Sequence, residues 1–167
     1  ASHARNREQR SALQRQAATA FLAEWAQTGH VRVVDGGNRF DVLGLNRALR
    51  LRRAPFYSAL QRVQVARAFT CYQMAVLLGG STPAGIPALV LNLLATFHDE
   101  NAPLPERLRL LTGCLQLLQA AARLAPVLLV VHPQPAEEPF LGRIRGAVDK
   151  TWEFALPLDS TQQLALF

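Results

Sequence analysis

Apolar positions along the chain follow two different spacings. Leu13, Ala17, Phe21 and Trp25 recur every four residues, which predicts an amphipathic helix over residues 7–27. The β-branched run Val31–Val34 follows within a few residues and predicts a strand. Further helices are predicted over 42–53, 56–61, 70–78, 105–124 and 140–148, and further strands over 62–66, 88–93, 127–131, 151–155 and 162–167.

This alternation of helix and strand predicts an α/β fold with a mostly parallel sheet flanked by helices. The strand over 88–93 is apolar on both faces, which is typical of a central strand. The last two strands predict a C-terminal antiparallel hairpin, with Trp152 packed in the core. We expect one domain over residues 1–167, in which residues 1–9 are a flexible N-terminal segment.

The helix over 105–124 is unusually rich in leucine. Its polar stripe is narrow, so its apolar width exceeds what one sheet-packed face requires. This width indicates a second buried face, and a protein partner could cover it.

The positive charge is concentrated in the first part of the chain. Through Arg67 there are twelve arginines against four acidic residues (+8), and beyond it six basic residues against eight acidic ones (−2), which gives the net charge of +6. Such a basic half favours an anionic partner, most commonly nucleic acid. Two groups of arginines are the candidate phosphate contacts, although a solvated helix face is the alternative for the second: Arg5, Arg7 and Arg10, and Arg47, Arg50 and Arg53.

Two features bear on the compartment. Cys71 and Cys114 lie in apolar, helix-like surroundings and are interpreted as reduced core thiols. No apolar run reaches the length of a membrane span, and the N-terminus has no apolar signal-peptide core. We therefore expect a cytoplasmic protein without a membrane partner.

The loop 35–38, which follows the first strand, is the first place to look for a ligand, because α/β proteins bind ligands beyond the carboxyl ends of strands. The sequence contains no GxxxxGK[ST], GxGxxG or GxSxG motif. His98-Asp99-Glu100 is more simply explained as a solvated loop than as a metal cluster, and His132 as a structural residue. We expect no metal, no cofactor and no catalytic residue.

Four segments in this order resemble the core of the RecA/RadA recombinases. They are Val31–Asp35 with Arg39-Phe40-Asp41, then Val63–Phe69 (VQVARAF), then Ala88–Thr96, and finally Pro126–Gln134. VARAF is the most specific of the four. The resemblance implies a P-loop ATPase core that acts on DNA.

The departures from the family's pattern concern the groups that hydrolyse ATP. The lysine of the phosphate-binding loop has no counterpart in this sequence. The acid that prepares the attacking water falls at Gly37, and the magnesium-orienting aspartate falls at Asn92. Only Gln134 remains as a possible phosphate-sensing residue. Loss of these groups removes the charge stabilisation on which phosphoryl transfer depends.

The sequence therefore predicts a non-catalytic RecA-like protein of DNA recombination or repair, which binds DNA, a recombinase partner or both. Two alternatives stay open at this point. One is a regulatory or structural partner subunit that makes no DNA contact. The other is an ATP-binding protein whose phosphate loop lies outside this chain.

Overall fold

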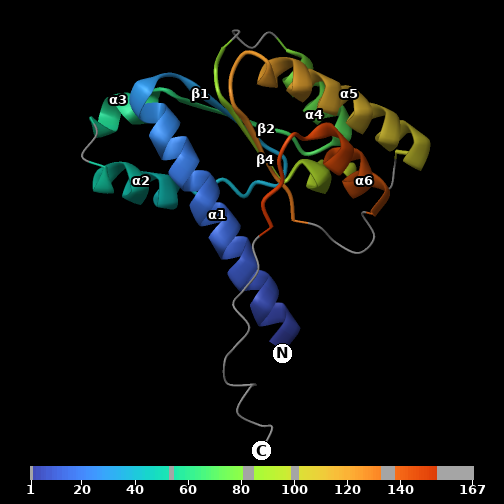
Figure 1. Cartoon of the computed structure of the whole chain (residues 1–167), viewed down its shortest axis with the longest axis horizontal. Helices are drawn as coiled ribbons and strands as arrows, with labels where there is room; N and C mark the ends of the chain where they lie inside the picture. The colour runs from blue at the N-terminus through green and yellow to red at the C-terminus, as the bar shows by residue number, and fades with distance from the viewer. Residues whose placement is uncertain (1, 53–54, 81–84, 99–101, 133–137, 154–167) are drawn as a thin grey trace, which may run out of the picture.

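The sheet has four strands, all parallel, in the order β2-β1-β3-β4. The computed structural model describes residues 2–52, 55–80, 85–98, 102–132 and 138–153 (Figure 1). The strands are β1 (Val31–Asp35), β2 (Val63–Arg67), β3 (Ala88–Leu91) and β4 (Val127–Val130). Val33 of β1 lies opposite Val65 of β2 and Leu89 of β3. The predicted parallel α/β architecture is therefore confirmed.

Three helices cover one face of the sheet: α1 (Ser2–Thr28), α2 (Val42–Leu51) and α3 (Phe56–Gln61). Val31 and Val33 of β1 point into this layer, where they pack with Leu22 of α1 and Leu49 of α2. Because side chains alternate across a strand, the neighbouring Val34 points to the opposite face. We call this side of the molecule the arginine layer, because it carries the exposed Arg47 and Arg50 of α2.

The other face is covered by α4 (Cys71–Gly79), the 3-10 helix η1 (Leu93–Phe97), α5 (Leu104–Ala122) and α6 (Glu138–Ala147). We call this side the leucine layer. Leu111, Cys114, Leu115 and Leu118 of α5 are buried in it. Helix α6 adds Phe140, Leu141 and Ile144 to the same core. Part of the extra apolar width of α5 is thus used within the chain, because α5 packs against both α4 and α6. Leu104 and Leu117 of α5 remain 44% and 40% exposed.

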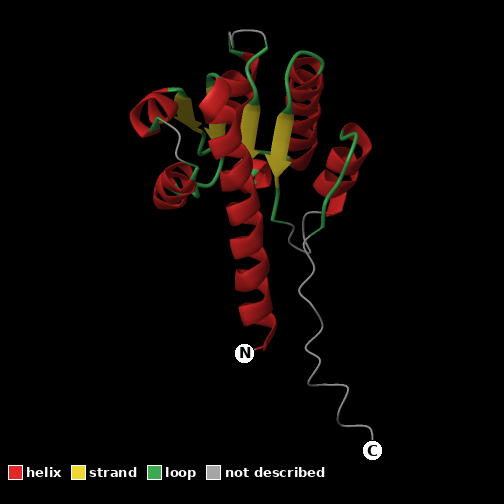
Figure 2. Ribbon diagram, turned by 60° about the vertical axis from the view of Figure 1, so that its left-hand side comes forward, coloured by secondary structure: helices red, strands yellow, loops and turns green. Residues whose placement is uncertain are grey.

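Helix α1 is much longer than the strands beside it (Figure 2). Its 27 residues rise by about 1.5 Å each, roughly 40 Å in all, whereas the five residues of β1 span about 17 Å. The helix ends beside the start of β1 and runs antiparallel to it. Its N-terminal part therefore continues past the carboxyl edge of the sheet, as Figure 1 shows.

The two ends of the chain differ from what the sequence predicts. The first helix begins at Ser2 rather than at residue 7, because no glycine or proline interrupts the residues between. The C-terminal hairpin is not shown: Thr151–Glu153 form no strand, and residues 154–167 lie outside the described part. Trp152 is 56% exposed, so the prediction that it packs in the core was wrong. The ammonium group of Lys150 lies 5.2 Å from the centre of its ring.

Within the described residues, no helix combines the length and apolar character that a membrane span requires. Cys71 and Cys114 are both fully buried and form no disulfide within the described residues, which confirms that they belong to the core. Burial raises the pKa of the Cys114 thiol to about 11. The thiol is therefore kept neutral in the dry interior between α4 and α5.

Candidate functional site at the carboxyl edge of the sheet

The strand order reverses between β1 and β3. From β1 the chain goes to β2 on one side, and β3 then returns to the other side of β1. Such a switch point opens a crevice beyond the carboxyl ends of the two strands, where open α/β sheets bind ligands. A cavity of about 270 Å³ lies at this edge. Its lining includes Gly37 after β1, Asn92 after β3 and His132 after β4.

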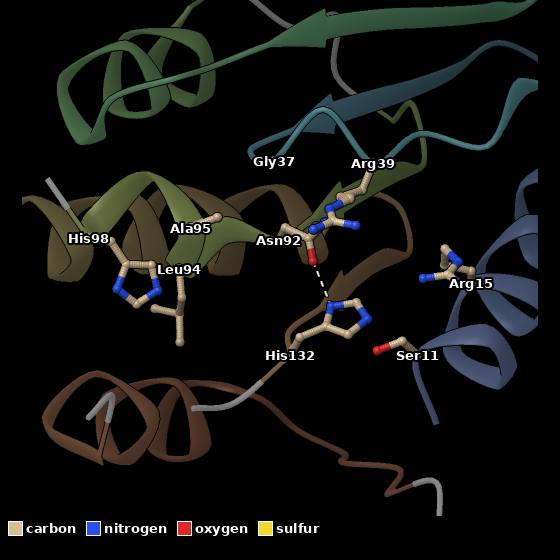
Figure 3. Close-up of a pocket in the computed structure, with 9 residues that line it drawn as sticks. All are labelled: Ser11, Arg15, Gly37, Arg39, Asn92, Leu94, Ala95, His98 and His132. Carbon is tan, nitrogen blue, oxygen red and sulfur yellow. Dashed lines mark hydrogen bonds between the residues drawn. The ribbon is translucent and has the colours of Figure 1, made fainter. Parts of the chain in front are cut away.

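The part of α1 that extends past the carboxyl edge of the sheet closes another side of this cavity, which we call the switch-point pocket. Ser11 and Arg15 of α1 line it together with Arg39. Figure 3 shows the side chains of Ser11 and Arg15 extending from α1 towards the region of Asn92 and His132. Residues far apart in the sequence, such as Ser11 and His132, therefore meet here.

Asp35 is fully buried and fixes the loop after β1. Its Oδ1 accepts hydrogen bonds from the backbone N–H groups of Gly37 and Arg39, both at 3.1 Å. Its Oδ2 accepts one from the N–H of Phe40 at 3.0 Å and lies 3.8 Å from the Arg67 Nε. Both carboxylate oxygens are thus used within the protein. Asp35 is a structural residue of the loop and not a metal ligand facing the pocket.

The two glycines after Asp35 allow the β1 and β3 loops to approach each other closely. A Cβ atom at Gly36 would lie 2.7 Å from the carbonyl oxygen of Asn92. A Cβ atom at Gly37 would lie 3.1 Å from both Cβ and Nδ2 of the same asparagine. Even the first carbon of a carboxylate side chain at residue 37 would therefore force Asn92 to move. Gly37 and Asn92, the two positions at which the sequence resemblance expects acidic residues, are therefore neighbours in space.

Asn92 adopts a left-handed backbone conformation, with φ 51° and ψ 42°. Asparagine tolerates this region better than most residues, and here it turns the chain from β3 into η1. Its Oδ1 accepts a hydrogen bond from Nδ1 of His132 at 2.6 Å, so this ring nitrogen carries the proton (Figure 3). His132 thus links the loop after β4 to the loop after β3, and it is also part of the pocket wall.

The switch-point pocket is lined by cationic and neutral groups. Two guanidinium groups (Arg15 and Arg39) and two imidazoles (His98 and His132) line it, and no carboxylate is among its lining residues within the described part of the chain. The described residues also contain no group of three His, Cys, Asp or Glu side chains that could hold a metal ion. A hard divalent cation prefers anionic oxygen ligands, whereas this lining attracts an anion.

The predicted basic residues lie in different places. Arg47 and Arg50 are exposed on α2, outside the pocket. Arg5, Arg7 and Arg10 belong to the projecting part of α1, but their side chains are outside the described part, as are residues Arg53 and Gln134. Arg52 is structural: it forms an ion pair with Glu24 at 3.3 Å and donates to the Ala20 carbonyl at 3.3 Å.

Sequence reasoning missed Arg15. Nothing in the local sequence distinguishes it from other polar residues of a helix, and only the length of α1 relative to the strands brings it to the carboxyl edge. Arg39 could be found from its position after a strand end, which is a general signal for a ligand loop.

No protein-family model matches this chain, and no curated protein matches it either. The fold and the geometry of the site are therefore the observations on which a function must be argued.

Proposed function

We propose that this chain is a non-catalytic RecA-like protein of DNA recombination or repair, which binds DNA through its arginine layer. The observation that carries the proposal is the chemistry at the switch point. Gly37 and Asn92, where the resemblance to the RecA/RadA core expects acidic side chains, lie side by side, and the lining is cationic. Such a pocket can hold an anion, but it offers no carboxylate to position magnesium or the attacking water.

The distribution of ion pairs supports DNA binding by the arginine layer. Within the described part of the chain, neither Arg47 nor Arg50 forms an ion pair, whereas Arg52 is neutralised by Glu24. Arginines without acidic partners on one helix face attract phosphate groups and make affinity fall with salt. This binding mode is largely independent of base sequence.

Two assays on the intact chain test this proposal. Gel shifts at low salt, with single-stranded and double-stranded DNA, should show complexes that dissociate as salt rises. An ATP hydrolysis assay with magnesium should show no turnover above the buffer. The absence of binding to either DNA form, or turnover abolished by Asn92→Ala, would overturn the proposal.

A protein partner is the second proposed function, and strand β2 supports it. Within the described residues, β2 is paired only with β1. The register places the backbone groups of Val63, Val65 and Arg67 on the open edge, because Arg62 and Ala68 bond to β1. Phe69, 67% exposed, follows directly. An unprotected edge with apolar side chains suits pairing with a strand of a recombinase paralogue or a second copy.

Substitution of Val65 by proline tests the partner surface. Proline removes an outward-facing N–H group but leaves the bonds to β1 in place, so the fold should persist. Light scattering and co-purification should show loss of the complex in Val65→Pro. A complex that is unchanged in Val65→Pro would contradict pairing at this edge.

A further inference from the structure

The corner between α2 and α3 carries aromatic and basic side chains together. Tyr57, at the start of α3, is 81% exposed, and Leu51, at the end of α2, is 84% exposed. Both are large hydrophobic side chains that do not contribute to the core. Their exposure next to arginines is the feature that the fold itself does not explain.

The aromatic rings of this corner are held in a defined arrangement. The guanidinium carbon of Arg50 lies 4.9 Å from the centre of the Phe56 ring. Phe56 in turn contacts Tyr57 edge to face, with ring centres 5.4 Å apart and an interplanar angle of 79°. Phe56 is half-buried against the core of the arginine layer, so it supports the more exposed Tyr57 from one side.

The charge of this corner favours an anionic ligand. Arg47 and Arg50 are three residues apart on α2 and therefore neighbours on one helix face. Neither forms an ion pair within the described part of the chain. Arg50 lies over the ring of Phe56, which contacts the exposed Tyr57, and Arg47 precedes Arg50 by one turn on α2. The corner therefore offers phosphate contacts and a surface for a base close together.

We propose that this corner is a single-stranded nucleic-acid site, in which a base stacks on Tyr57 while Arg47 and Arg50 hold the adjacent phosphates. Duplex DNA hides the faces of its bases within the stack, so only an unpaired strand can use the ring. Base stacking on aromatic side chains tolerates any sequence. The inference rests on the proposed DNA binding and specifies which form of DNA binds and where.

The binding of labelled oligothymidine and of a duplex of equal length to the intact chain tests this site, with fluorescence anisotropy as the readout. Tyr57→Ala should weaken oligothymidine binding by about 5- to 100-fold and leave duplex binding unchanged. Tyr57→Phe keeps the ring and should bind like the wild type. Tyr57 is largely exposed, so its loss should leave the fold intact, which circular dichroism can verify.

The chain offers a matched control in its other tyrosine. Tyr72 is also exposed, but it lies on α4 in the leucine layer, and Tyr72→Ala should bind oligothymidine like the wild type. Oligothymidine binding that does not change in Tyr57→Ala would overturn this inference and leave the proposed DNA binding standing. If polyglutamate displaces oligothymidine from the wild type but not from Tyr57→Ala, the inference is also overturned, because an acidic protein would then be the ligand of this corner. Failure of both DNA forms to bind would overturn the proposed function as well.

Discussion

The two layers that cover the sheet bury it in similar ways, but their helices are arranged differently and expose different groups of side chains to solvent. Both contain fully buried leucines, such as Leu49 in the arginine layer and Leu111 in the leucine layer. In the leucine layer the helices pack on one another as well as on the sheet, because α5 lies against both α4 and α6. In the arginine layer α2 and α3 pack beside α1, and their outward sides carry arginines and the exposed ring of Tyr57.

This difference separates what holds the fold from what is available for binding. The apolar width of α5 indicated a surface for a partner, yet α4 and α6 of the same chain cover much of it. Arginine on α2 is compatible with a merely solvated face, but Arg47 and Arg50 lack the acidic partner that Arg52 has within the described residues. Binding is therefore expected at the arginine layer and at the carboxyl edge, and stability should depend on both layers.

The largest effect should come from truncating the buried leucines of either layer. Leu49→Ala and Leu111→Ala should each lower the free energy of unfolding by about 2–5 kcal/mol, because both side chains are fully buried and leave a cavity. Urea denaturation measures this. Leu51→Ala, on the same helix as Leu49, is the control and should stay within about 0.5 kcal/mol. If Leu49→Ala lost little unfolding free energy while Leu111→Ala lost the expected amount, the arginine layer would add little to the core.

Asp35→Asn tests the loop that lies between the two layers. The carboxylate accepts three backbone hydrogen bonds, and an amide has one accepting oxygen and presents its NH2 group to the remaining N–H donors. We expect a loss of about 2–3 kcal/mol in unfolding free energy by urea denaturation.

Asp41→Asn is the matched control for that substitution. Asp41 caps α2 by accepting from the N–H of Gly44 at 2.8 Å, and asparagine caps helices about equally well. A loss in Asp41→Asn as large as that in Asp35→Asn would show that the buried loop has no special role.

The pKa of Cys114 gives a stability effect at alkaline pH that belongs to the leucine layer. Burial raises this pKa to about 11 from an unfolded value of 9.0, so between these values the unfolded thiol loses its proton and the folded one keeps it. The contribution of this thiol to the free energy of unfolding is therefore constant below pH 9 and should fall by roughly 2 kcal/mol as the pH rises to 11. Urea denaturation at several pH values measures it. In Cys114→Ala the unfolding free energy should fall less steeply with pH. If it fell as steeply as in the wild type, burial of the Cys114 thiol would not explain the decline.

The smallest effect should come from an anion in the switch-point pocket. Inorganic phosphate should raise the melting temperature by roughly 2–4 °C at concentrations well above its Kd, with or without a chelator, because no metal is required. Arg15→Gln should remove most of this shift, whereas Arg123→Gln, on the leucine layer, should not. A melting-temperature shift that requires magnesium would contradict direct binding of phosphate by the arginines of this pocket.

Much of the fold follows from local pattern. The central position of β3 was predictable from its uninterrupted apolar run, and all four of its residues are buried. The helices were found by their period and by their proline and glycine boundaries. The core position predicted for Trp152 was wrong because a single aromatic residue says little without the strand around it.

The site was only partly predictable. The loop after β1 was found because the end of a strand followed by glycines indicates a ligand position. The proximity of Gly37 to Asn92 depends on the strand order, and the presence of Arg15 in the lining of the same pocket depends on the length of α1. Neither is encoded in a short window of sequence. The aromatic corner also required the structure, because exposure distinguishes Tyr57 from a core residue.

The salt dependence of DNA affinity tests the central claim, binding by the arginine layer, most directly. For oligothymidine, the logarithm of the affinity should fall linearly with the logarithm of salt concentration, with a slope of about −0.7 for each phosphate contacted. Arg47→Ala should make this slope less steep by about 0.7, and Arg123→Ala should leave it unchanged. A slope near zero, or one that changes only in Arg123→Ala, would contradict DNA binding by the arginine layer.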